Sequence, residues 1–292
     1  MAYAALVLAG VIWGLTFPLM KIAIARFEPH HVAVYRLVFA CVGSIVLLPA
    51  VVWGRWRWPV RSDLGFLVLL GVLVGWGQGV AFTYGLAWTP VTTAALIVPL
   101  NPIFTVLLAS WWLQERVTAL QWLGVGLAAM GMVVLVLRRG GGMEGGHVAG
   151  PLIMALAPLS WAIFTVVSKP LLLRYHPPVL TTYTTVLGAL SVLPMARPAT
   201  LGGLIDSTWT ELGVVVYVGA VALAGGFYLW YVGLARLGAA RAASFALLVP
   251  LFGVLGGVLF LGEPIGWPLL AGGGLILTGM RLVLAPQRAA HG

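Results

Sequence analysis

Neutral polar and aromatic side chains lie inside the long apolar stretches of this chain, where a fixed charge would be costly. In the first half of the chain these are Trp13, Thr16, Gln78, Tyr84 and Asn101, and in the second half Ser160, Trp161, Trp230 and Ser244. Hydroxyl and amide groups form hydrogen bonds, and flat aromatic rings stack on the apolar parts of a solute. These residue types predict a binding site for a neutral or zwitterionic organic solute.

Each of these residues also has a structural explanation. Tryptophan and tyrosine concentrate at membrane interfaces, so residues such as Trp13 and Tyr84 can be interfacial belt residues. Gln78 and Asn101 can be interhelical hydrogen-bonding groups, each worth about 1 kcal/mol. Gln78 is the stronger candidate for a solute contact, because it lies near the centre of an apolar stretch. The glycine stripe around it, Gly71–Gly79, is predicted to serve close helix packing.

Proline residues interrupt two of the apolar stretches at related positions. Pro99 and Pro102 lie in the fourth stretch, and Pro250 lies in the ninth. Proline removes a backbone hydrogen bond, so such breaks mark either a binding site with a hinge or a passive kink. We predict hinges at these three prolines.

Groups that support catalysis or energy coupling are missing from the apolar stretches. All seven carboxylates, including Glu115 and Glu263, lie in or next to the interruptions between them. No G-x-x-x-x-G-K-[ST] motif is present, so the sequence implies neither a nucleotide-driven motor nor an ATPase subunit. His, Asp and Glu do not cluster at metal-ligand spacing, and Cys41 is the single cysteine. We therefore expect no enzyme, no cofactor and no metal site, and organic cations are poor candidate substrates.

Three basic residues lie near the ends of apolar stretches. Lys21 and Lys169 are expected to anchor helix ends, where a lysine can reach the membrane surface and complement the helix dipole. Recognition of a carboxylate is the alternative role. Arg36 lies just inside the second stretch, and the same two explanations apply to it.

The composition requires a membrane around these residues. Hydrophobic residues make up 61% of the chain, charged residues 8%, and the mean hydropathy is +1.06. A membrane-spanning helix needs about 20 mostly apolar residues. Ten candidate stretches are present, at residues 3–24, 31–53, 64–86, 91–113, 120–137, 148–172, 179–195, 211–234, 239–261 and 267–284. We predict an all-α integral membrane fold with ten transmembrane helices.

The chain contains an internal duplication. A shift of 148 residues places Trp13 on Trp161, Lys21 on Lys169 and Glu115 on Glu263 without an insertion. We predict a single membrane domain, residues 1–292, with one five-helix repeat at 3–140 and another at 148–288. Because each repeat has an odd number of spans, the two repeats should be inverted relative to each other around a central cavity.

The positions of the basic residues predict the orientation. Ten of the 16 Lys and Arg residues fall on the side of the termini, so both termini are expected in the cytoplasm. The net charge of +9 does not predict a nucleic-acid partner, because the basic residues are scattered over helix ends. Membrane lipid and a small-molecule substrate are the expected partners, and both a monomer and a homodimer are compatible with the sequence.

In combination, these motifs resemble those of the drug/metabolite transporter superfamily, specifically its EamA-type ten-helix permeases. The first copy carries Trp13-Gly14, Lys21, Ala94-Ala95, Pro99, Pro102 and Leu113-Gln114-Glu115-Arg116, and the second carries Trp161, Lys169, Ala242-Ala243-Ser244, Pro250 and Leu261-Gly262-Glu263-Pro264. The resemblance covers roughly residues 5–285. It implies a carrier of the bacterial inner membrane that works by alternating access. It also implies a cavity lined by the third, fourth, eighth and ninth helices, with the first and sixth contributing.

We therefore predict a secondary transporter that exports small neutral metabolites, in particular aromatic and other neutral amino acids. A carrier of purines, sugars or drug-like solutes is the alternative, followed by a non-transport membrane protein. The residues leave the direction of transport and proton coupling open.

Overall fold

The computed structural model describes residues 2–52, 57–101, 103–104, 107–108, 118–136, 148–172, 174–237, 245 and 248–283. Within this part of the chain all regular structure is helical and no strand occurs. The helices of the first half are α1 (Ala2–Arg26), α2 (Pro29–Val52), η1 (Arg61–Asp63), α3 (Leu64–Val72), η2 (Leu73–Ala81), α4 (Phe82–Ala87), α5 (Val91–Ile97) and α7 (Ala119–Val136). Those of the second half are α8 (Ala149–Leu172), α9 (Pro177–Val192), η3 (Leu193–Met195), α10 (Pro198–Ile205), α11 (Trp209–Val216), η4 (Tyr217–Gly225), α12 (Gly226–Leu237), α14 (Leu248–Leu261) and α15 (Trp267–Val283).

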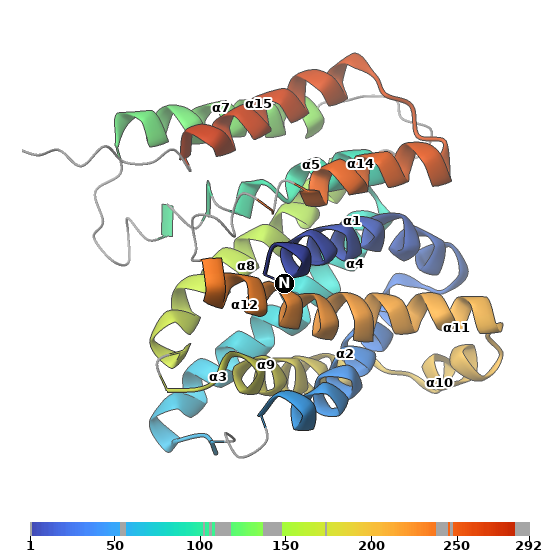
Figure 1. The fold of residues 1–292 in the computed structure, drawn as a ribbon. Helices are drawn as coiled ribbons and strands as arrows, with labels where there is room; N and C mark the ends of the chain where they lie inside the picture. Colours follow the sequence, from blue (N-terminus) through green and yellow to red (C-terminus); the bar gives the residue numbers. More distant parts are fainter. Residues whose placement is uncertain are drawn as a thin grey trace, which may run out of the picture.

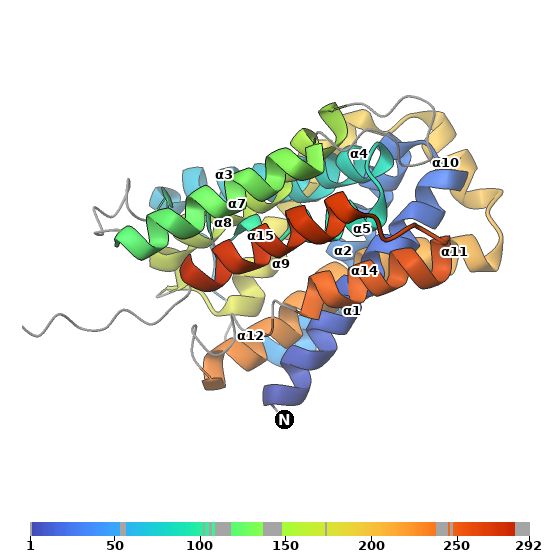
Figure 2. The same cartoon turned by 90° about the horizontal axis from the view of Figure 1, so that it is seen from above.

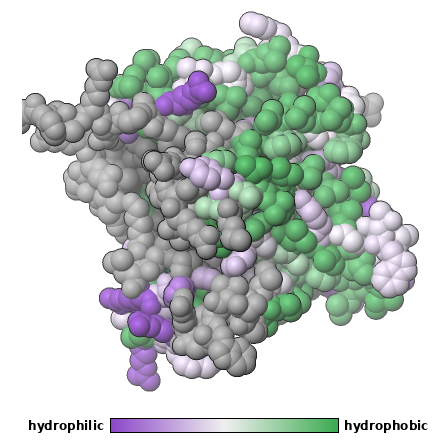
Figure 3. All heavy atoms as spheres, viewed as in Figure 1, coloured by the Kyte–Doolittle hydropathy of each residue, from purple (hydrophilic) through white to green (hydrophobic). Residues whose placement is uncertain are grey.

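Helix length and apolarity confirm an integral membrane protein. Six helical segments are long and apolar enough to cross a membrane: Ala2–Arg26, Pro29–Val46, Arg61–Ala87, Ala149–Ser168, Pro178–Met195 and Trp209–Trp230. Three further apolar helices are shorter, at Ala119–Leu135, Leu248–Leu261 and Trp267–Val283. Large apolar side chains are exposed on the outside, for example Val46, Leu259 and Leu270. On the face drawn in Figure 3, most of the coloured surface is hydrophobic, as contact with lipid requires.

The short helix α10 falls in the predicted interruption between the seventh and eighth stretches. Pro198 is its first residue, a position where the missing N–H of proline costs nothing. The Thr200 hydroxyl accepts a hydrogen bond from the backbone N–H of Arg197 over 2.9 Å, which closes the first turn. Local capping chemistry therefore forms a helix in a segment that the hydropathy pattern assigns to a loop.

The two halves of the chain pack against each other through many of the described helices. Helix α1 contacts α12 and α14, while α8 contacts η2 and α4. Helix α2 contacts η4 and α9, and α9 in turn contacts α3 and η2. Helices α7 and α15 lie side by side in both ribbon views (Figures 1 and 2), and Figure 1 shows them along the top edge of the bundle.

Both long segments in the middle of the two halves contain a π-helical section. Residues Leu73–Ala81 form η2 in the first half, and Tyr217–Gly225 form η4 in the second. The wider turn of a π-helix is rare and is frequently found at functional sites. Glycines let η2 approach α9, because a Cβ on Gly75 would lie 2.7 Å from the carbonyl oxygen of Gly188. The glycine stripe thus serves packing, as the sequence favours.

Lys21 caps the break between α4 and α5. Its Nζ donates hydrogen bonds to the carbonyl oxygens of Leu86 (2.8 Å), Ala87 (3.1 Å) and Thr89 (3.1 Å). These carbonyl groups lie at and just beyond the end of α4, where regular helical hydrogen bonds cease, and a lysine also complements the negative end of the helix dipole. Lys21 therefore stabilises a helix end, as the sequence predicts, but the end is that of α4 and not that of its own helix α1.

Glu263 caps the other side of the same break. Its carboxylate accepts hydrogen bonds from the backbone N–H groups of Val91 (2.5 Å) and Thr92 (2.7 Å), at the start of α5. Gly262 precedes it with φ 65°, a left-handed conformation that favours glycine and turns the chain at the end of α14. Glu263 thus stabilises the N-terminus of a neighbouring helix.

Candidate functional site

A cavity lies at the centre of the described bundle, between the two halves. It encloses about 150 Å³ of open space. Its walls come from α1, α2, η2, α4, α8, η4, α12, α14 and α15, together with the turn that follows α5. Seven of the predicted site and hinge residues line it: Trp13, Thr16, Gln78, Pro99, Asn101, Trp161 and Trp230.

An aromatic wall forms one side of this cavity. Trp13 and Trp161, which occupy equivalent positions in the two copies, meet edge to face with ring centroids 6.5 Å apart. Phe227 stacks on Trp161 with 4.8 Å between the ring centroids, and the centroid of Trp230 lies 5.6 Å from that of Trp13. Offset stacking and edge-to-face contacts are the favourable arrangements of aromatic pairs. These four rings give the cavity a rigid apolar surface.

The π-helical section η4 orients the first of these rings. Trp13 Nε1 donates a hydrogen bond to the carbonyl oxygen of Ala222, inside η4, over 2.8 Å. Gly226, the residue that follows η4, leaves room for the indole, because a Cβ there would collide with Trp13 Nε1. The position of Trp13 therefore depends on backbone groups of the other half of the chain.

The polar side of the cavity is built around η2. Gln78 Nε2 donates a hydrogen bond to the carbonyl oxygen of Ala157 in α8 over 2.6 Å. The backbone carbonyl oxygen of Gln78 accepts a hydrogen bond from Arg36 Nη1, also over 2.6 Å. The guanidinium of Arg36 lies 4.5 Å from the centroid of the Phe82 ring. No carboxylate belongs to the cavity lining in the described part of the chain.

The chain leaves the helical conformation next to the cavity, in the turn that holds Pro99. Helix α5 ends at Ile97, and the backbone N–H of Asn101 bonds to the carbonyl oxygen of Val98 over 3.0 Å. This local break agrees with the removal of a backbone donor by Pro99. Pro250 is different, because it is the third residue of the described α14 and is buried outside the cavity lining. Pro102 and Ser244 lie outside the described residues.

Tyr84 and Ser160 lie apart from the central cavity. They line a more open groove between α4 and α8, with about 430 Å³ of space, together with Trp76 and Trp88. Gly77 also lines this groove, and a Cβ at Gly77 would collide with Ser160. These two predicted site residues are therefore on the outer side of the same pair of helices.

Arg36 and Phe82 are cavity residues that the sequence reasoning did not select. For Arg36 the sequence offered anchoring of a helix end and, as the alternative, recognition of a carboxylate, but it did not place this residue in the site; in the structure Arg36 is 4% exposed. The signal that could have identified it is its position, a charged residue several positions inside an apolar stretch. Phe82 carries no such signal, because phenylalanine is common on every face of a membrane helix.

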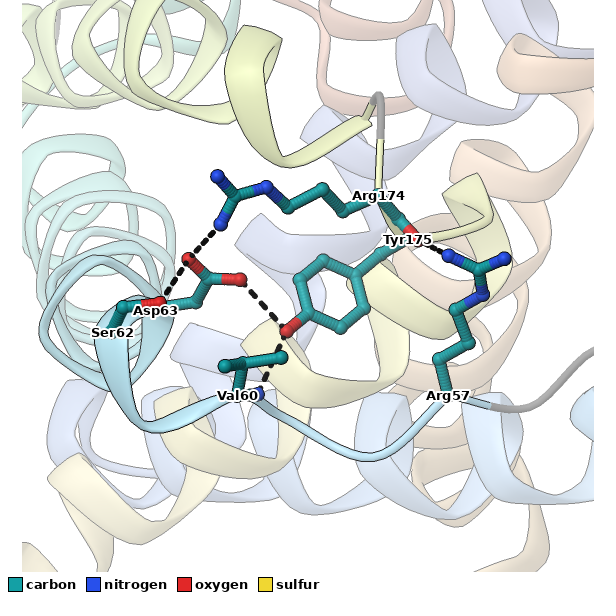
Figure 4. A network of polar contacts seen from close by, with 6 residues as sticks. All are labelled: Arg57, Val60, Ser62, Asp63, Arg174 and Tyr175. Atoms are coloured by element: carbon teal, nitrogen blue, oxygen red, sulfur yellow. Dashed lines mark hydrogen bonds and ion pairs between the residues drawn. The ribbon is translucent and has the colours of Figure 1, made fainter.

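An ion pair joins the two halves at one end of the bundle (Figure 4). Arg174 Nη1 lies 2.7 Å from Asp63 Oδ1, and the Tyr175 hydroxyl donates to Asp63 Oδ2 over 2.9 Å. The same hydroxyl accepts a hydrogen bond from the backbone N–H of Val60 over 3.0 Å. Burial, together with the bond to Asp63, raises the pKa of the Tyr175 phenol.

A second ion pair joins the halves at the opposite end. Arg26, the last residue of α1, pairs with Glu211 in the first turn of α11 at 2.8 Å. Lys21 brings the end of α1 next to the end of α4, whereas Asp63 lies before the start of α3. The continuous helical segment α3–η2–α4 runs from the Asp63 pair at its start to the region of the Arg26 pair at its end. The two ion pairs thus lie at opposite ends of this segment.

Within the described residues no group of three or more His, Cys, Asp or Glu side chains could hold a metal ion. The described carboxylates at 63, 211 and 263 are engaged in the contacts given above. The site consists of aromatic, amide and hydroxyl groups with one guanidinium.

Similar proteins are membrane transporters. The chain is 28% identical to an uncharacterized transporter of Archaeoglobus fulgidus, over 96% of this chain and 97% of the relative. It is 29% identical to a probable terminal-alkyne amino-acid exporter of Streptantibioticus cattleyicolor, over 96% and 92% of the two chains. It is 26% identical to a probable amino-acid metabolite efflux pump of Salmonella typhimurium, over 92% and 90%.

A solved crystal structure shares the fold. It superposes with a TM-score of 0.59 over 96% of each chain, at 22% sequence identity. The profile of the EamA-like transporter family matches the sequence twice, at residues 1–137 and 148–285. The chain therefore belongs to the EamA-like transporter family, a family of multi-pass membrane transporters and not of enzymes, within the drug/metabolite transporter superfamily.

Proposed function

We propose that this protein is a secondary transporter that exports neutral amino acids, the aromatic ones among them, by alternating access through the central cavity. The observation that carries the proposal is the cavity between the two halves, walled by Trp13, Trp161 and Trp230 and provided with the amide of Gln78. An aromatic side chain can stack on the indole rings, while the amide and hydroxyl groups bind the polar end of the solute. The names of two relatives, an amino-acid exporter and an amino-acid metabolite efflux pump, favour the same substrate class.

The architecture that we propose has ten transmembrane helices in two inverted five-helix repeats, residues 3–140 and 148–288 of one membrane domain. Separate matches of the family profile to the two halves support the duplication. The helix contacts support a two-fold arrangement, because a contact made by a helix of the first half with the second half has a counterpart made by the equivalent helix of the second half with the first. Helix α1 packs on α12 while α8 packs on η2 and α4, and α2 packs on η4 while α9 packs on η2. Rocking of such halves around a fixed cavity is the common basis of alternating access.

We propose a location in the bacterial inner membrane with both termini in the cytoplasm. The larger number of basic residues on the side of the termini supports this orientation. Exposed tryptophans near helix ends, Trp58, Trp209 and Trp267, are suited to the two lipid interfaces. Lipid is thus the expected surrounding of the bundle.

Within the cavity, we assign solute contact to Trp13, Thr16, Gln78, Asn101, Trp161 and Trp230, and hinge motion to Pro99. Thr16 Oγ1 donates a hydrogen bond to the carbonyl oxygen of Ile12 over 2.8 Å, and its oxygen retains the capacity to accept one. Ser244, Pro102 and Pro250 stay predictions for the same region. Tyr84 and Ser160 line the outer groove in this conformation.

Counterflow in proteoliposomes tests the proposal. Vesicles are preloaded with one unlabelled solute at a time, and the entry of labelled phenylalanine is followed. Acceleration by aromatic and small neutral amino acids, but not by acidic or basic amino acids, purines or sugars, is the expected result. If correctly inserted protein shows no counterflow with any amino acid, the amino-acid assignment fails.

A further inference from the structure

We infer that Arg36 holds the carboxylate group of the transported solute in the central cavity. The inference rests on the proposed function for the identity of the solute as an amino acid. It goes beyond that function by naming the group that is recognised and the residue that recognises it.

The position of Arg36 is unusual for a charged residue. It lies in α2, and since a helix rises about 1.5 Å per residue, it is far enough from Pro29 to enter the apolar part of the bundle. The residue is 4% exposed and lines the central cavity. A charged side chain at such a place is costly unless it is paired, and it commonly marks the path of a substrate.

Arg36 has no anionic partner in the described part of the chain. No carboxylate there lies within ion-pair distance of it. Asp63 pairs with Arg174, Glu211 pairs with Arg26, and Glu263 accepts backbone N–H groups. The positive charge that faces the cavity is therefore not neutralised by these side chains.

The guanidinium is held in place with donors to spare. Nη1 bonds to the Gln78 carbonyl oxygen at 2.6 Å, and the Phe82 ring supports the cation at 4.5 Å. Nε is buried and has no hydrogen-bond partner among the described residues. Leaving a buried donor unpaired is unfavourable, and burying an unpaired charge more so. A carboxylate that enters the cavity would accept a hydrogen bond from the free donor and neutralise the positive charge, since a guanidinium binds a carboxylate through two parallel N–H groups.

The rest of the cavity fits the other parts of an amino acid. The indole rings of Trp13, Trp161 and Trp230 offer an apolar surface for the side chain. The position equivalent to Arg36 in the second copy is Thr184, whose hydroxyl donates to the Thr181 carbonyl oxygen over 3.0 Å. The cation thus comes from one half only, which gives a solute with one carboxylate a single preferred orientation.

Binding to purified protein in lipid nanodiscs tests this inference by calorimetry. The ligands are L-phenylalanine, 3-phenylpropanoate, which lacks the amine, and L-phenylalaninamide, which lacks the carboxylate. We expect both carboxylates to bind the wild-type protein at least about tenfold more tightly than the amide, as for a charge-assisted hydrogen-bonded pair. If the wild-type protein binds the amide as tightly as the amino acid, the inference is wrong, and no variant is needed to show it.

Arg36→Gln should reduce the preference for carboxylates over the amide to within about twofold. Arg36→Lys should keep part of this preference, since a lysine retains the positive charge but not the two parallel N–H donors of a guanidinium. Arg281→Gln is the matched control, because Arg281 is exposed in the last turn of α15. It should bind all three ligands as the wild type does. An Arg36→Gln protein that keeps the full carboxylate preference would sink the inference.

The results separate this inference from the proposed function. Amino-acid counterflow that is unchanged in Arg36→Gln would leave the exporter standing and remove Arg36 from its site. Carboxylate binding that depends on Arg36, without counterflow of any amino acid, would support the carboxylate site and reject the amino-acid exporter. If Arg36→Gln does not fold, the wild-type ligand series and Arg36→Lys decide.

Discussion

Arg174 and Asp63 form an ion pair, with 2.7 Å between Nη1 and Oδ1. Arg26 lies 148 residues before Arg174 and Glu211 lies 148 residues after Asp63, and these two residues form the ion pair at the other end of the bundle. Each pair joins an arginine of one half to a carboxylate of the other. Alternating access, as proposed, requires the halves to separate at one end at a time. The two pairs are placed to hold one end each.

Arg174→Gln should lower the free energy of unfolding by about 1 kcal/mol, because the arginine side chain is 60% exposed and solvent weakens the pair. Asp63→Asn should cost more, since Asp63 is buried and also accepts from Tyr175. Thermal unfolding in detergent measures both variants. The double variant should be less destabilised than the sum of the two single changes, whereas strict additivity would show that the pair does not couple.

Tyr175 should make the stability of this end sensitive to alkaline pH. Burial raises the pKa of its phenol above the ordinary value of 10.0, so the folded state favours the neutral form. This contribution is complete below pH 10 and is lost as the pH rises through the folded-state pKa. The melting temperature of the wild-type protein should therefore fall more steeply than that of Tyr175→Phe above pH 10. Parallel pH curves for the two proteins would contradict this prediction.

Gln78→Ala should abolish most counterflow while leaving the protein folded, because the amide belongs to the cavity wall. Its loss removes one interhelical hydrogen bond, worth about 1 kcal/mol in a membrane protein. Gln121→Ala is the matched control, since Gln121 Nε2 donates to the Val283 carbonyl oxygen over 3.3 Å at the α7–α15 contact, away from the cavity. Normal transport by Gln78→Ala would remove Gln78 from the site. Equal losses in both variants would assign the effect to stability.

Gly226→Ala should displace the indole of Trp13 and break its hydrogen bond to Ala222, because the added methyl group would occupy the place of Nε1. We expect a severalfold loss of phenylalanine counterflow, from the misplaced aromatic wall. Gly213→Ala in α11 adds the same methyl group where nothing lies within 4 Å, so it should transport normally and be slightly more stable. Wild-type transport by Gly226→Ala would show that the Trp13 position is not needed.

Lys21→Met should destabilise the break between α4 and α5, because three carbonyl oxygens lose their donor. The expected loss is about 1–3 kcal/mol, the cost of leaving buried acceptors unpaired. Unfolding in detergent measures it, and Glu28→Gln is the control at a largely exposed carboxylate near the same helix end. An unchanged melting temperature for Lys21→Met would return this lysine to the role of a surface anchor.

Much of the fold could be predicted from composition and repetition alone. The apolar stretches predict an all-helical membrane protein because an unpaired backbone group is too costly in lipid. The offset of Trp13 and Trp161 predicts two related copies, and the family profile matches each half. Seven of the twelve site and hinge residues named from the sequence lie in the cavity wall, in line with the tendency of polar side chains within a span to face the interior of the bundle.

Hydropathy and repetition specify the class of the protein, its all-helical membrane character and the residue types expected in the site. Packing of the helices fixes which face each residue occupies, because the lipid-facing and interior sides of a membrane helix are both apolar. It turned Ser160 to the outer groove, brought Arg36 to the cavity, and placed Glu263 on the backbone of Val91 and Thr92. Such contacts join residues far apart in the chain, and no local pattern of hydropathy specifies them.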